Sequence, residues 1–156
     1  MKGLNNFLGN QTVTTSVEVF GETQQAELVE LISFDILKYL MPRTTKDIDV
    51  EIHFINKCDG QVAGDCYGDR DEAFINIAKG SYNYKYSFNE QFLTLCHELV
   101  HAKQFIKGEL SGNGSTWHGV DMHLINNIQD QPWEQEAFKL EVELYNKYIK
   151  MFKRIL

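Results

Sequence analysis

The most constraining feature of the sequence is a stretch that begins at Ser87 and ends at Gly108. Ser87 is followed three residues later by Glu90, which is the pattern of a capping box at a helix start. Gly108 is a favourable residue just past a helix end. Between them, apolar residues recur at helical spacing on one side of the wheel. They are Phe88, Phe92, Leu95, Cys96, Leu99 and Ile106. The stretch therefore predicts an amphipathic helix that packs one side against a core.

The opposite side of this helix carries His97 and His101. Residues four apart on a helix share a face, with Cβ atoms about 5–6 Å apart, so both imidazoles can bind one metal ion. Glu98 lies one step round the helix, where it can serve as general base toward a zinc-activated water. The spacing thus predicts a catalytic Zn²⁺ site, with His97 and His101 as ligands and Glu98 as the catalytic residue. The alternative is two surface histidines on an ordinary helix.

A catalytic zinc ion usually has three protein ligands, and the last predicted helix offers two candidates for the third. This helix runs from Trp133 to about Phe152, after Pro132 at its first position. Glu134 falls inside its apolar side, where a carboxylate is costly without a partner. Glu134 is therefore the preferred third ligand. Glu136, near the edge of that side, is the alternative.

Two further residues remain candidates for the metal or its surroundings. His118 follows Trp117 in a segment without clear periodicity, and it is either a third ligand or a residue that contacts the substrate oxyanion. Cys66 is a weaker alternative, because peptide deformylases combine an upstream cysteine with a similar helix motif. The surroundings typical of that family are absent from this sequence.

The remaining pattern predicts a single α+β domain over residues 1–156. A helix is expected over residues 23–40. Strands are expected over 48–55, near 63–67 and over 72–78, and residues 1–20 form an edge strand or a flexible arm. The strand over 72–78 precedes the motif helix, and it is expected to be the sheet edge that aligns an extended substrate by β-augmentation.

Composition narrows the classes of partner. A net charge of -7 argues against nucleic-acid binding, because an acidic chain repels phosphate backbones. No apolar segment approaches the ~18 residues of a membrane span. The start of the sequence does not resemble a secretory signal, and three cysteines form an odd count. These observations predict a cytoplasmic protein with reduced thiols and do not indicate an oligomeric state.

Over about residues 90–145 the sequence resembles small, mostly phage-encoded zinc metallopeptidases of the zincin superfamily, often labelled SprT-like. The resemblance is carried by the segments 97–104 (HELVHAKQ), 107–110 (KGEL), 117–119 (WHG) and 132–137 (PWEQEA). It implies a minimal zincin-like fold, with a small twisted sheet packed against the motif helix and a ligand-bearing C-terminal helix. It also implies a bacterial or infected host cell as the setting.

The resemblance bears on the third ligand as well. In glutamate-type zincins the ligand often reads Glu-x-x-Ala, with Asp or Asn next, and Glu134 begins such a run. Phe138 stands where the Asp or Asn would be, so a partner for the histidines is missing or comes from elsewhere. SprT-like proteases proper use a His-Gly-x-x-aromatic element, which His118 begins and in which Met122 replaces the aromatic residue.

The expected function is that of a zinc-dependent, metallopeptidase-like hydrolase acting on a peptide or protein. The alternative is a non-catalytic, zinc-stabilised binding protein of viral or bacterial origin, although a structural site has no need for Glu98. A DNA-associated protease is a third hypothesis, which the acidic charge disfavours.

Overall fold

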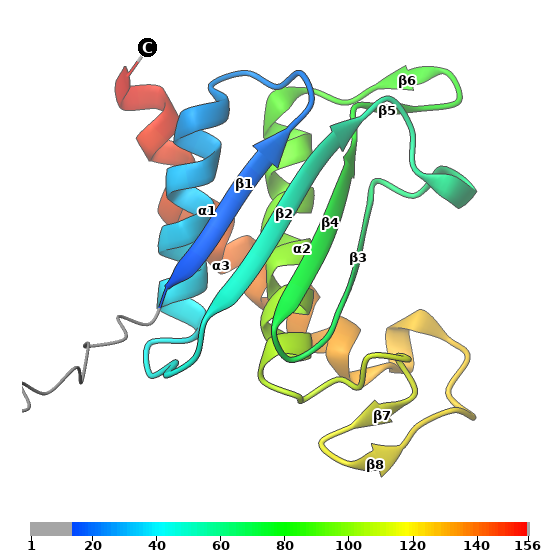
Figure 1. Cartoon of the computed structure of the whole chain (residues 1–156). Coiled ribbons are helices and arrows are strands. Elements are labelled where there is room, and N and C mark those ends of the chain that lie inside the picture. Colours follow the sequence, from blue (N-terminus) through cyan, green and yellow to red (C-terminus); the bar gives the residue numbers. More distant parts are fainter. Residues whose placement is uncertain (1–13, 156) are drawn as a thin grey trace, which may run out of the picture.

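The computed structural model describes residues 14–155, and a four-stranded sheet forms its centre (Figure 1). Part of the predicted N-terminal arm or edge strand lies outside the described residues. The described part begins with β1 (Thr15–Phe20), which is an edge strand of this sheet.

The sheet has the order β1-β2-β4-β3, in which β1, β2 (Ile48–Ile55) and β4 (Glu72–Ala78) are parallel. Strand β3 (Gly64–Gly68) pairs with β4 in the antiparallel direction. In β2, apolar and polar residues alternate, so one row of side chains is buried and the other faces outward. The buried row faces the helices.

Three helices lie on one side of the sheet: α1 (Ala26–Leu40) and α2 (Phe88–Ile106) pack on its face, and α3 (Pro132–Ile155) packs behind them (Figure 1). Buried apolar residues from all three helices and from β1, β2 and β4 form one core cluster. The predicted α+β class is confirmed. Helix α1 begins three residues later than predicted, because Gln25 adopts a left-handed backbone with φ of 56°.

The remaining elements are short. Two small hairpins pair β5 (Gly80–Ser81) with β6 (Tyr84–Lys85), and β7 (Thr116–Trp117) with β8 (Val120–Asp121). Single 3₁₀ turns occupy Asp59–Gln61 and Ile128–Asp130. None of the helices in the described part is long and apolar enough to cross a bilayer.

The prediction that strand 72–78 is a sheet edge is wrong. Strand β4 pairs with β2 on one side and with β3 on the other, so it has no free edge. Its sequence fits this interior position, because Asn76 is the one polar residue between Ala73 and Ala78. Mostly apolar sequences are typical of interior strands in parallel sheets. The edge of the sheet on this side is β3.

Helix α2 is fixed at both ends by the residues that predicted it. The Glu90 amide donates to Ser87 Oγ, and the Ser87 amide donates to Glu90 Oε2 at 2.7 Å, which completes the capping box. At the other end Gly108 has φ of 69°, a conformation that favours glycine. This helix therefore begins and ends where the sequence indicates.

Candidate metal centre

Three side chains from α2 and α3 bring their ligand atoms together. His97 Nε2 lies 3.2 Å from one Glu134 carboxylate oxygen, and His101 Nε2 lies 3.3 Å from the other. The two Nε2 atoms are 3.0 Å apart. Within the described chain, this is the one group of three or more His, Cys, Asp or Glu side chains with metal-site geometry.

Hydrogen bonds on the far side of each imidazole orient these Nε2 atoms. His97 Nδ1 donates to Glu141 Oε2 at 2.7 Å, and His101 Nδ1 donates to Gln104 Oε1 at 2.8 Å. The orientation of the Gln104 amide is itself set, because its Nε2 donates to the Trp133 carbonyl at 2.9 Å. With Nδ1 protonated, a neutral imidazole presents a lone pair on Nε2. Two lone pairs and a carboxylate therefore converge, and such an arrangement favours a cation.

The separations of these atoms fit zinc. A tetrahedral site with bonds of ~2.0–2.1 Å has ligand atoms about 3.3 Å apart. The 3.0 Å between the two Nε2 atoms, and the 3.2 and 3.3 Å from these atoms to the two different oxygens of Glu134, are close to that length. Two imidazole nitrogens and one carboxylate oxygen are also a common ligand set of catalytic zinc.

The pKa values of Glu134 and His97 are shifted because histidines and carboxylates lie in contact in the cluster. Burial acts to raise the pKa of Glu134, but hydrogen bonds from His101 and His97 in their protonated forms outweigh it and lower the pKa to about 2. Burial acts to lower the pKa of His97, but hydrogen bonds to Glu134 and Glu141 outweigh it and raise the pKa. The cluster therefore stabilises positive charge, as a metal site must.

Glu98 lies beside the cluster and is 5 % exposed. Burial raises its pKa to about 8; the charge of His101 opposes this rise, and the charges of Glu134, Asp65 and Glu141 add to it. A cation held by the cluster would lower this pKa, because it would stabilise the carboxylate.

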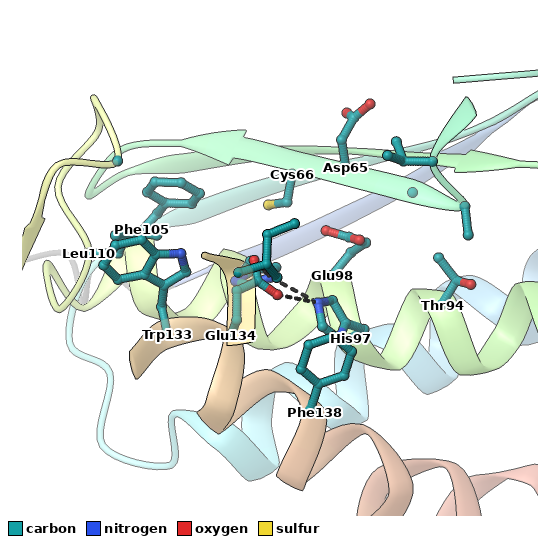
Figure 2. Close-up of a pocket in the computed structure, with 16 residues that line it drawn as sticks. Asp65, Cys66, Thr94, His97, Glu98, Phe105, Leu110, Trp133, Glu134 and Phe138 are labelled. Carbon is teal, nitrogen blue, oxygen red and sulfur yellow. Dashed lines mark hydrogen bonds and ion pairs between the residues drawn. The ribbon is translucent and has the colours of Figure 1, made fainter. Parts of the chain in front are cut away.

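The cluster opens into a pocket of about 550 Å³ between β3, α2 and the start of α3. Figure 2 shows Phe105, Leu110 and Trp133 at one end of this pocket, Thr94 at the other, and Phe138 next to His97. Strand β3 approaches α2 closely here, because a Cβ on Gly64 would lie 2.7 Å from Thr94 Cγ2. The site therefore combines a polar floor with a largely apolar wall, as is typical of ligand pockets.

The structure does not bring the alternative ligands into the cluster. Glu136 instead pairs with Lys103 at 2.5 Å and accepts a hydrogen bond from Gln104. His118 has φ of 47°, packs its ring on Trp117 and does not line the pocket. Cys66 does line the pocket, but it is not part of the three-residue group.

Two residues that orient the histidines were not predicted from the sequence. Glu141 lies seven residues after Glu134, which is two helical turns along the same face of α3. Gln104 lies three residues after His101, on the neighbouring turn of α2. Either spacing could have indicated a side chain that contacts a ligand histidine. Phe138 packs on the His97 ring at 4.8 Å, and the polar partner of His97 is Glu141, one turn further along α3.

Comparisons of the chain with known protein families, with curated proteins and with solved structures find no match. The geometry and chemistry of the cluster therefore carry the functional argument.

Proposed function

We propose that the chain is a zinc-dependent hydrolase of the metallopeptidase type, built on a minimal zincin-like domain. The observation that carries this proposal is the convergence of His97 Nε2, His101 Nε2 and a Glu134 carboxylate, with the buried Glu98 beside them. Zinc, when bound there, supplies a Lewis acid that polarises a carbonyl group and lowers the pKa of water to about 7.

The number of ligands supports catalysis over a structural role. Structural zinc sites are closed by four protein ligands, whereas catalytic sites keep one position open. In the described part of the chain the group contains three ligand side chains. His118, which would favour a closed site if it joined Glu134, does not line the pocket. The alternative of a non-catalytic, zinc-stabilised binding protein is therefore less well supported.

In this proposal Glu98 accepts the proton of the attacking water and later delivers it to the leaving amine. Its neighbour His97 is a ligand, yet Glu98 points elsewhere, toward β3 (Figure 2). Glu98 Cγ lies so near this strand that a Cβ on Gly64 would be 3.1 Å from it. The base is thus held between the cluster and the strand.

The same arrangement supports an extended peptide or protein as substrate. Strand β3 is the edge of the sheet next to Glu98, and its outer side pairs with no other strand among residues 14–155. A peptide bound along this edge would carry its backbone past the site. In this proposal β3 takes the role that the sequence pattern assigned to residues 72–78.

The test compares wild type with Glu98→Gln, after zinc loading, in peptide-bond cleavage of an unstructured protein. The variant is expected to keep zinc and to lose hydrolysis by about 10²–10⁴-fold, the range for a general base. Glu72→Gln, an exposed change at the start of β4, is the matched control and keeps both. Undiminished cleavage by Glu98→Gln would contradict the mechanism. A zinc-loaded wild type without cleavage would favour the binding-protein alternative.

A further inference from the structure

A second pocket, of about 440 Å³, lies at the end of the sheet where three connections meet. The α1–β2 loop supplies Arg43 and Lys46, the β3–β4 turn supplies Arg70, and Lys107 follows the end of α2. These segments gather at the same end of the molecule (Figure 1). The pocket shares no lining residue with the one that holds the histidines.

The pocket is positively charged, whereas the chain as a whole is negatively charged. Four of its lining residues are cationic and none is acidic, although the net charge of the chain is -7. The chain has three arginines, and two of them, Arg43 and Arg70, line this pocket. Such a concentration of positive charge in an acidic chain indicates a site for an anion.

Neighbouring acids compensate the lysines but not the arginines. Lys46 Nζ is 3.9 Å from Asp71, and Lys107 Nζ is 3.3 Å from Glu109. Neither Arg43 nor Arg70 forms an ion pair with any residue between 14 and 155. Two guanidinium groups thus remain as free donors.

Hydrogen bonds fix one cation of the pocket, and a second cation lies against the backbone. Lys46 Nζ donates to the Ile106 carbonyl at 3.0 Å and also to the Arg70 carbonyl, so it links the loop, the turn and α2. The Arg70 guanidinium lies against Gly108, where a Cβ would be 3.0 Å from Nη1. The pocket is therefore built by specific contacts and is more than a chance cluster of surface charges.

We propose that this pocket binds a small molecule that carries a phosphate group. A guanidinium presents planar, paired donors that match phosphate oxygens, and the hydroxyls of Thr44 and Thr45 on the pocket wall add further donors. A dianionic group also suits the two uncompensated guanidinium groups of Arg43 and Arg70 better than a single carboxylate does. The volume falls within the roughly 300–1,000 Å³ of small-molecule sites, so it leaves room for an organic body beside the phosphate.

The test is an NMR titration of the ¹⁵N-labelled, zinc-loaded protein with inorganic phosphate and with glycerol 3-phosphate, and glycerol is the uncharged control. Saturable shifts are expected at the amides of Arg43 to Lys46, Arg70 and Lys107. Arg43→Ala and Arg70→Ala should each weaken binding by about tenfold, as loss of a charge-assisted contact does. The double variant Lys139→Ala, Lys150→Ala removes two exposed charges elsewhere and should bind as wild type does.

Three results would overturn the proposal. They are the absence of saturable binding, equal weakening in the Lys139/Lys150 control, and shifts confined to the histidine cluster that both arginine variants preserve. The last result would mean that phosphate binds at the metal. A failure here leaves the hydrolase proposal untouched, because the two sites share no residue and the readouts are separate.

Discussion

Two neighbouring networks join α2 to the start of α3, and they differ in one respect. In the first, Lys103 of α2 binds Glu136 of α3 at 2.5 Å and Glu109 at 2.8 Å, so the chain supplies its own cation. In the second, His101 and Glu134 each lie two residues before Lys103 and Glu136, and both His101 and His97 face Glu134. When both histidines are neutral, their Nε2 atoms and the Glu134 carboxylate oxygens are all hydrogen-bond acceptors. We therefore propose that a metal ion completes the second network, as Lys103 completes the first.

The largest expected effect separates Glu134 from Glu136. Glu134→Ala removes a proposed ligand and should weaken zinc binding by more than about 100-fold, beyond the effect of an outer partner. Glu136→Ala, two residues along the same helix, should leave the affinity close to that of wild type. Competition with a chromophoric chelator measures both. Equal losses of zinc affinity in the two variants, or a larger loss for Glu136→Ala, would contradict the assignment of Glu134 as the ligand.

The next effect concerns the orientation of His97. Glu141→Ala removes the acceptor that lies 2.7 Å from His97 Nδ1 and should weaken zinc binding by about 10–100-fold. Glu143→Ala is the matched control on α3, because Glu143 instead accepts a hydrogen bond from the Tyr39 hydroxyl. The same chelator assay applies. An unchanged affinity in Glu141→Ala would show that this hydrogen bond does not position the ligand.

The smallest expected effect concerns the first network, in which Lys103 is the cation. Lys103→Met removes the cation between Glu109 and Glu136 and should lower the free energy of unfolding by about 1–3 kcal/mol, the cost of leaving a partly buried polar group without its partner. Zinc affinity should remain near that of wild type. Urea denaturation measures the stability, and the exposed Lys150→Met is the control. A variant that kept its stability but lost zinc would reverse the assigned roles.

Some parts of the fold and the candidate site could be predicted from the sequence better than others. Helix α2 was predictable because local signals define it: Ser87 and Glu90 form the capping box, and Gly108 ends the helix. The preference for Glu134 over Glu136 followed from helix periodicity, together with the upstream histidine motif and the family resemblance of residues 132–137. These signals depend on spacing along one element, which a sequence shows directly.

Strand order and long-range contacts were less accessible. Alternation identified residues 72–78 as a strand, but alternation does not say which strands lie beside it. The bond between His97 and Glu141 joins two helices, and its prediction needs their relative rotation. The basic pocket draws Arg43, Arg70 and Lys107 from separate connections, so only the assembled fold brings them together.

The central claim is that a metal ion completes the His97, His101 and Glu134 cluster. Its most direct test is a crystal of the protein purified with zinc, measured with anomalous diffraction at the zinc edge. One anomalous peak is expected, within bonding distance of Nε2 of both histidines and of a Glu134 oxygen. No stoichiometric zinc, or a peak bound by Glu136 or His118 in place of Glu134, would contradict it.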